Sequence, residues 1–252
     1  MKIINGWSFG VITDGYHQSR IIKIVESILS QNIPNFEIII IGDKKEKYNF
    51  KFNNNVIRIF DFENLGEWSN NNKDKTFPIS LKKNIIIDKA KFEKICFLHD
   101  YVYLDQNWYS GILKFETEND WMILTNKIFN QDNTRVFDWV LYDQPITYKK
   151  VTFLPEDKNI NHYQYIPGYY WCAKKEVMSK FKLNEILKWG EKEDVEWSVR
   201  VRKIYKFSFN KFSSVRFLKY KEGPWSKKHP KYKKVMLRSS FIRFLFIFKF
   251  LR

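Results

Sequence analysis

The sequence predicts an α/β fold with a mostly parallel sheet flanked by helices, and three observations carry this prediction. Residues 7–13, WSFGVIT, are apolar and β-branched and run into a turn, which is typical of a buried strand. Four consecutive isoleucines at 38–41 indicate a second strand, buried on both faces. Between them, apolar residues recur over 21–29 at the spacing of one helical face. Strand, helix and strand in this order form the βαβ unit of a parallel sheet.

Further elements are predicted along the rest of the chain. A polar loop over 61–78 is followed by a helix that Ser80 caps and that ends at Ala90. The apolar run 95–98 then predicts a central strand that ends at His99 and Asp100. The remaining predictions are strands at 56–60, 121–125 and 165–173, the last broken by Pro-Gly, and helices at 108–115, 175–181 and from about 189 onward. Residues 126–161 give no clear pattern.

Composition bounds the class of protein. The chain has 252 residues and 44% hydrophobic content, which suffices for a sizeable core. We expect one main domain over 1–210 and a C-terminal extension over 211–252. Cys96 and Cys172 lie among apolar neighbours without the spacing of a metal site or a disulfide framework. The first ten residues lack the apolar core of a signal peptide, so we expect a cytoplasmic protein.

The net charge of +16 lies entirely in the C-terminal part. From Arg200 onward there are 17 Lys or Arg and one acid, whereas the first 199 residues hold 27 basic and 27 acidic residues. This asymmetry points to an anionic partner, either nucleic acid or acidic lipid. The end of the chain, 235–252, is apolar with interspersed bases, but it is shorter than the roughly 20 apolar residues that span a bilayer. It is predicted either to lie on the inner face of the membrane or to pack on the core or a second copy.

Acidic residues follow three of the predicted strands: Asp14, Asp43 and Asp100. Each one alone has an ordinary explanation, because Asp commonly closes a strand in a turn. In a parallel sheet, however, all three would lie along the carboxyl edge, where open α/β sheets bind ligands. Carboxylates gathered in a cleft hold a metal or transfer protons.

Charged residues also lie near two predicted helix starts. Glu193 and Asp194 fall in a first turn, where the helix dipole favours ionised carboxylates. They are either ordinary helix-start charges or a base that accepts a proton from an attacking alcohol. Lys82 and Lys83 are either a solvated face or ligands of a diphosphate. The aromatic residues 169–171 and Trp189 are either core residues or a platform for sugars.

The order of these features resembles a GT-A glycosyltransferase close to family 2. The resemblance covers about residues 7–205 and rests on Thr13-Asp14, Ile41-Gly42-Asp43, Lys83-Asn84, the segment FLHD at 97–100, Pro167-Gly168 and the segment WGEKEDVEWSVR at 189–200. It implies transfer of a sugar, with inversion, from a nucleotide-diphosphate donor, most simply a UDP-sugar, to a hydroxyl of a glycan or lipid-linked glycan. Surface polysaccharide or glycan assembly is the implied setting.

The resemblance also implies residue roles. Thr13, Asp14 and Asp43 would bind the nucleoside, and Lys83 would lie by the nucleotide. His99 and Asp100 would adjoin the diphosphate. Asp194 would be the catalytic base, with Glu193 contacting acceptor or donor sugar.

The sequence departs from the family at one point. The family's second acidic residue is missing, because Tyr101 and Val102 follow Asp100. Mn²⁺ or Mg²⁺ would then bind through Asp100, the phosphates and His229, unless Lys or Arg residues replace the metal. His229 is otherwise a surface residue of a basic loop. A GT-A protein without activity and a nucleic-acid-binding protein that uses the basic region after Arg200 are the alternatives.

Overall fold

The computed structural model describes residues 4–42, 54–60, 77–136, 140–142, 150–151, 164–187 and 190–221. Its first elements are strand β1 (Ile4–Ile12), helix α1 (Gln18–Leu29) and strand β2 (Phe36–Ile41). β1 and β2 pair in parallel, with Val11 opposite Ile40, so the predicted βαβ unit is confirmed. Helix α1 buries the face that carries Ile21, Ile24, Val25 and Ile28.

The remaining elements include the predicted ones, with shifted ends, and others. They are the 3₁₀ turn η2 (Asn54–Val56), β3 (Ile57–Phe60), α2 (Ile79–Lys89), β4 (Phe92–His99), β5 (Val102–Leu104), α3 (Trp108–Glu116), β6 (Ile123–Phe129), β7 (Val140–Tyr142), β8 (Lys150–Val151), β9 (Gln164–Tyr165), β10 (Tyr170–Lys174), α4 (Lys175–Lys180), α5 (Glu193–Val201) and β11 (Phe207–Phe217). Those that were not predicted are η2, β5, β7, β8 and β11.

The central sheet has the strand order β3-β2-β1-β4-β10-β6-β11-β5. Strands β3, β2, β1 and β4 are mutually parallel, and β11 is parallel to β6. Strand β10 is antiparallel to both its neighbours, and β5 is antiparallel to β11. A small second sheet has the order β8-β7-β9. The carboxyl ends of β1, β2 and β4 therefore lie next to one another, which is where ligands of open α/β sheets bind.

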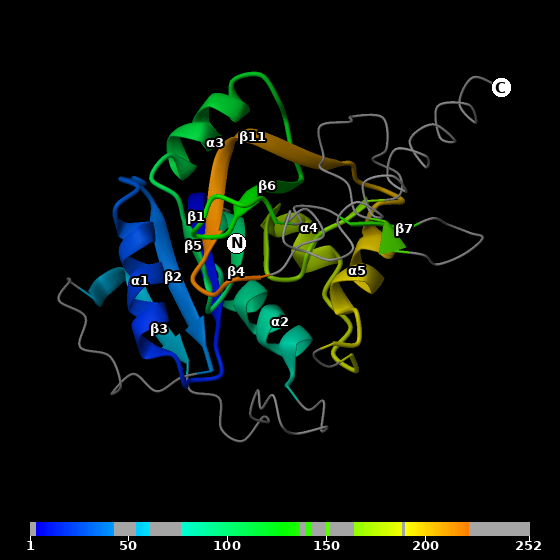
Figure 1. Ribbon diagram of the computed structural model, residues 1–252. Helices are drawn as coiled ribbons and strands as arrows, with labels where there is room; N and C mark the ends of the chain where they lie inside the picture. The colour runs from blue at the N-terminus through cyan, green and yellow to red at the C-terminus, as the bar shows by residue number, and fades with distance from the viewer. Residues whose placement is uncertain are drawn as a thin grey trace.

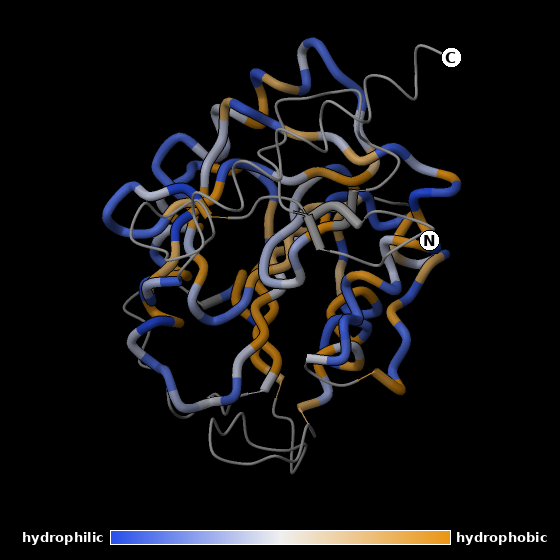
Figure 2. Tube along the Cα trace, turned by 45° about the vertical axis from the view of Figure 1, so that its right-hand side comes forward, coloured by the Kyte–Doolittle hydropathy of each residue, from blue (hydrophilic) through white to orange (hydrophobic). Residues whose placement is uncertain are grey.

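Helices cover both faces of the sheet (Figure 1). One core cluster joins α1 and α3 to side chains such as Phe9 and Leu98, and the other joins α2, α4 and α5 to side chains such as Ile39 and Phe97. The hydropathy colouring in Figure 2 shows apolar strands inside and polar segments outside. Strand residues alternate between the two clusters, because successive side chains of a strand point to opposite faces.

One expectation from the sequence differs from the structure. Ser80 is not the N-cap of α2, because the helix begins at Ile79 with Pro78 at the cap position. The Ser80 hydroxyl instead donates to the Leu187 carbonyl at 3.1 Å and ties α2 to the segment before α5. Strand β11 crosses the boundary expected between residues 210 and 211, so the central sheet continues to Phe217.

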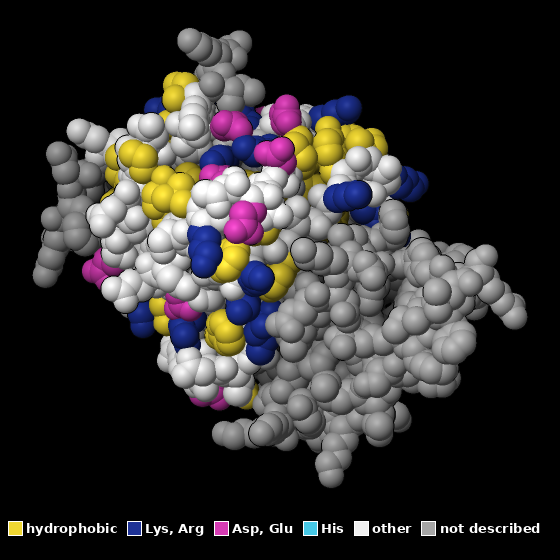
Figure 3. Space-filling model, turned by 90° about the horizontal axis from the view of Figure 1, so that it is seen from above, with side chains coloured by type: hydrophobic (Ala, Val, Ile, Leu, Met, Phe, Trp, Pro, Cys, Tyr) yellow, Lys and Arg dark blue, Asp and Glu magenta, His cyan; other side chains and the backbone are white. Residues whose placement is uncertain are grey.

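Several predicted residues lie outside the described part of the chain: Asp43, Trp189, His229 and the apolar end 235–252. None of the helices in the part that is described is long and apolar enough to cross a membrane. On the face seen in Figure 3, the coloured lysines and arginines are interspersed with acidic and hydrophobic side chains.

Candidate active site

Asp100 lies at the carboxyl end of β4, beside the end of β1. Its backbone N–H donates to the Ile12 carbonyl, and its side chain accepts a hydrogen bond of 3.1 Å from the Thr13 hydroxyl. The side chain is buried, and this burial together with the Asp14 carboxylate raises the pKa of Asp100, which the Thr13 hydrogen bond opposes. The structure thus brings together Thr13, Asp14 and Asp100, as the strand ends predicted.

Lys82 and Gly42 shape the same edge. The buried Lys82 ammonium donates to the Thr13 carbonyl at 2.8 Å and lies 4.1 Å from the centre of the Phe77 ring. Gly42 has a φ of +109°, and a Cβ there would lie 2.2 Å from the Thr13 carbonyl oxygen. Only glycine therefore lets the chain leave β2 so close to the loop that carries Thr13 and Asp14.

A second buried cluster joins α2 to the start of α5. The Lys83 ammonium donates to the Glu193 carboxylate at 3.1 Å and to the Gly168 carbonyl at 3.0 Å, and it lies 4.5 Å from the centre of the Trp171 ring. The Gly168 N–H in turn donates to the Asp194 carboxylate at 2.8 Å. Glu193 and Asp194 both occupy the first turn of α5, as predicted. Lys83 is enclosed, so the interpretation of a solvated lysine face is wrong for this residue.

The cluster alters the acidity of Asp194. Loss of hydration and the neighbouring Glu193 carboxylate raise the pKa of Asp194 to about 6, while Lys83 and the N–H groups of Gly168 and Val195 oppose this rise. A carboxylate with such a pKa is ionised at neutral pH and is a stronger base than an ordinary Asp. The arrangement therefore suits proton abstraction from a hydroxyl.

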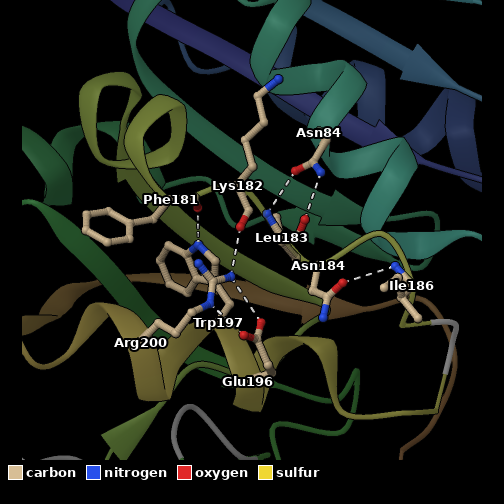
Figure 4. A network of polar contacts seen from close by, with 9 residues as sticks. All are labelled: Asn84, Phe181, Lys182, Leu183, Asn184, Ile186, Glu196, Trp197 and Arg200. Atoms are coloured by element: carbon tan, nitrogen blue, oxygen red, sulfur yellow. Dashed lines mark hydrogen bonds and ion pairs between the residues drawn. The ribbon is translucent and has the colours of Figure 1, made fainter.

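A network of hydrogen bonds fixes α5 against α2 (Figure 4). The Asn84 amide exchanges two hydrogen bonds, of 2.9 and 3.0 Å, with the backbone of Leu183. The Trp197 indole donates to the Phe181 carbonyl at 2.6 Å, and Arg200 donates to the Lys182 carbonyl at 2.8 Å. The chain enters α5 through Lys192, whose φ is +64°. These contacts set where Glu193 and Asp194 lie.

Tyr101 connects the two clusters. It is buried, and its pKa is raised by burial and by the carboxylates of Asp100, Glu193 and Asp194. The backbone links the same two clusters, because the His99 N–H donates to the Tyr169 carbonyl at 3.1 Å and the preceding Gly168 N–H donates to Asp194. His99 contacts the Tyr101 hydroxyl through Nδ1 at 3.2 Å, and burial together with Lys83, Lys221 and Lys219 keeps its pKa well below the usual range. His99 is consequently neutral at physiological pH.

Two lysines of this site were not predicted from the sequence. The Lys219 ammonium lies 4.1 Å from the centre of the Tyr101 ring, and the Lys221 ammonium lies 4.0 Å from the centre of the Tyr169 ring. Both follow β11, whose pairing returns the chain to the end of β4: the Leu218 N–H donates to the Tyr101 carbonyl. Their only signal in the sequence was the basic charge of the region after Arg200.

Two residues of the predicted site lie in parts of the chain that the structure does not describe. Asp43 and His229, the predicted base-contacting residue and metal ligand, lie outside the described residues. Among the residues that the structure does describe, no group of three or more His, Cys, Asp or Glu side chains is arranged to hold a metal ion. Asp100 and Asp14 together offer carboxylate oxygens of the kind that Mg²⁺ and Mn²⁺ combine with substrate phosphates.

Another hollow, of about 740 Å³, lies at the opposite edge of the sheet, near the start of β4. Four of its charged side chains form ion pairs: Lys94 with Glu116 at 2.7 Å and Lys174 with Glu93 at 2.5 Å. It is lined by residues near the starts of β1 and β4, by the segment between α3 and β6 and by the end of β10, and it does not include Asp100 or Asp194. The candidate active site is therefore the carboxyl edge.

We compared the sequence and the structure with those of known proteins. No protein-family model matches the sequence, and no curated protein matches it either. Among solved structures, GalNAc-T7 with UDP, GalNAc and Mn²⁺ is similar, with a TM-score of 0.61 and 17% identity over 90% of this chain and 45% of that one. A fragment of TarS from S. aureus, residues 1–349, is similar with a TM-score of 0.55 and 14% identity over 83% of this chain and 60% of that one.

A longer TarS structure gives a TM-score of 0.57 with 14% identity, over 84% of this chain and 36% of that one. The chain thus spans less than two thirds of the length of each of these structures. Both proteins are GT-A-type glycosyltransferases, and the likeness extends over most of this chain. The fold of this protein is that of the GT-A glycosyltransferases.

Proposed function

We propose that this protein transfers a sugar, with inversion, from a nucleotide-diphosphate donor to a hydroxyl of an acceptor glycan. The observation that carries the proposal is the link between the end of β4, which holds Asp100, and the start of α5, which holds Glu193 and Asp194. The His99 N–H donates to the Tyr169 carbonyl at 3.1 Å, and the N–H of the preceding Gly168 donates to the Asp194 carboxylate at 2.8 Å. A GT-A sheet with carboxylates at the end of β4 and at the start of α5 suits a displacement at an anomeric carbon.

The reaction follows from these roles. The acceptor hydroxyl oxygen attacks the anomeric carbon, while the bond from that carbon to the diphosphate oxygen breaks and its electron pair leaves with the nucleoside diphosphate. Asp194 takes the proton that the hydroxyl loses, because its raised pKa makes it an effective base. One base opposite the leaving group suffices for a single displacement with inversion.

The remaining polar residues are assigned to the donor. Thr13, Asp14 and Asp43 would contact the nucleoside, with Asp43 nearest the base, and Asp100 and His99 would adjoin the diphosphate. Lys83, which contacts Glu193 in the structure, would hold the α5 start in place next to the nucleotide. A UDP-sugar is the first donor to test, because GalNAc-T7, which has the same fold, was solved with UDP.

A divalent cation, Mn²⁺ or Mg²⁺, is the proposed cofactor. Asp100 would hold it together with His229, and the cation would neutralise charge on the departing diphosphate. A cation held by few protein ligands plus substrate phosphates is common for these ions, so the carboxylates near Asp100 fit the proposal.

The acceptor is proposed to be a glycan or a lipid-linked glycan of surface polysaccharide assembly. The basic region after Arg200 and the apolar end 235–252 suit an anionic membrane surface, which would bring the enzyme to a lipid-linked acceptor on the cytoplasmic face. Flotation of the full chain with anionic liposomes tests this point: recovery in the vesicle fraction is expected, and absence from it would reject membrane association.

The proposed activity is tested first by donor binding. Thermal unfolding of the full chain is measured with UDP-, GDP-, dTDP- and ADP-sugars, each with Mn²⁺ and with EDTA. We expect one nucleotide class to raise the unfolding temperature, because a ligand that binds only the folded state stabilises it. If none does so while nucleic acid binds with a steep salt dependence, the basic region would indicate a nucleic-acid-binding protein instead.

A further inference from the structure

Lys219 and Lys221, which follow β11, lie beside the segment after Asp100, where the family's second acidic residue is missing. Neither Tyr101 nor Val102, which follow Asp100, is acidic. Instead the Lys219 ammonium lies over the Tyr101 ring, and the Lys221 ammonium lies over the neighbouring Tyr169 ring. Resting on the proposed function, we propose that Lys219 and Lys221 bind the diphosphate of the nucleotide donor directly.

The backbone around the two lysines is held in place. On one side, the Leu218 N–H donates to the Tyr101 carbonyl at 2.8 Å. On the other side, the Lys221 N–H donates to the Asn130 side chain at 2.9 Å, and the Asn130 amide donates back to the Lys221 carbonyl at 3.0 Å. The lysines therefore project from a fixed stretch of chain at the site, which lowers the entropy cost of binding.

The carboxylates near Asp100 make positive charge necessary for diphosphate binding. Asp14 and Asp100 repel a diphosphate, so its binding requires positive charge nearby. Lys82 and Lys83 are buried and donate to the Thr13 and Gly168 carbonyls, where they support the site. Lys219 and Lys221 are only partly buried and face aromatic rings. Phosphate oxygens accept charge-assisted hydrogen bonds from ammonium groups, which are stronger than hydrogen bonds between neutral groups.

The pKa of Lys219 is consistent with a position near the Asp100 and Asp14 carboxylates. Burial lowers the pKa of Lys219, and the Asp100 and Asp14 carboxylates oppose this change. A diphosphate beside Asp100 would therefore meet the ammonium groups of Lys219 and Lys221, which follow β11, as well as any cation that Asp100 holds.

The experiment measures UDP, GDP, CDP and ADP binding to the full chain by calorimetry, in EDTA and in Mn²⁺. The test variant is Lys219→Gln with Lys221→Gln, and Lys219→Arg with Lys221→Arg is the conservative variant. Lys203→Gln with Lys206→Gln is the matched control, because both of these lysines are exposed near the start of β11 and the same charge is removed. Thermal unfolding verifies that each variant folds.

We expect the wild type to bind one nucleotide in EDTA, and the Gln variant to bind it at least tenfold more weakly, or about 1.4 kcal/mol. The Arg variant should stay within threefold and the control within twofold. Equal losses in the Gln variant and the control, or wild-type binding only with Mn²⁺, would overturn the inference while leaving the proposed function intact. If no nucleotide binds the wild type in either condition, the inference and the proposed function both fail.

Discussion

The Lys83 ammonium lies 3.1 Å from the Glu193 carboxylate, and both side chains are shielded from solvent, with 0% and 6% exposure. The pair joins α2 to the first turn of α5. Because a buried charge without its partner is costly, Lys83→Met should lower the free energy of unfolding by about 3–5 kcal/mol. Chemical denaturation measures this change.

The exposed pair of Lys182 and Asp88 provides the control for that prediction. Its side chains are 44% and 55% exposed, so Lys182→Met should cost no more than about 1 kcal/mol. If Lys83→Met and Lys182→Met cost the same, the buried pair does not stabilise the α5 start.

The pH dependence of turnover should report on Asp194. Its pKa is raised to about 6, and the proposed base works only when ionised. The rate of nucleoside diphosphate release should therefore rise with pH through about 6 and then level off. A rate that is flat from pH 5 to 8 would contradict this role.

Lys83 should also move that pH profile. Its ammonium lowers the pKa of Asp194, so its loss raises that pKa above 6. In Lys83→Met the rising limb should shift to higher pH, provided that the variant is assayed below its unfolding temperature. An unchanged limb with a reduced rate would mean that Lys83 only supports the fold.

Gly168 lets the backbone approach both carboxylates. A Cβ at this position would lie 3.0 Å from a Glu193 oxygen and 3.1 Å from an Asp194 oxygen, closer than side chains normally pack. Gly168→Ala should displace these carboxylates and reduce turnover more than tenfold, because catalytic groups tolerate little misplacement. Gly190→Ala is the comparison: its φ of +82° brings backbone strain, but no atom of the described residues lies within 4 Å of the added Cβ. That variant should lose stability and keep its turnover.

Asn84 should contribute to stability through the Leu183 backbone. Asn84→Ala would leave the buried N–H and carbonyl of Leu183 without the amide they contact, at a cost of about 1–3 kcal/mol. Asn184→Ala removes one acceptor from a surface turn and should cost less. Thermal unfolding of the two variants distinguishes the cases, and equal costs would mean that the network in Figure 4 does not hold α5.

Much of the fold could be predicted because its signals are local. The isoleucine run of β2 and the helical spacing of α1 each specify an element within a few residues, and their order gives the parallel sheet. Strand β11 was missed because its sequence, FSFNKFSSVRF, is polar and basic and its pairing shifts register between Asn210 and Ser214. Such a strand has no regular alternation to detect.

The site was predictable where a residue's place follows from a strand end or helix start, as for Asp14, Asp100 and Asp194. The burial of Lys83 could not be predicted, because two adjacent lysines look the same in the sequence whether they are buried or exposed to solvent. Lys219 and Lys221 depend on the long-range pairing of β11 with β5, which brings Phe217 opposite Val102. No local pattern reports such a contact.

The central claim is that Asp194 accepts the proton of the attacking hydroxyl. Its most direct test is the rate of UDP release from UDP-sugars by the full chain with Mn²⁺ and acceptor glycans, comparing the wild type with Asp194→Asn. We predict release by the wild type and a rate at least about a hundredfold lower in the Asn variant, which keeps the size of the side chain but cannot take the proton. Equal release by the two proteins would contradict the account.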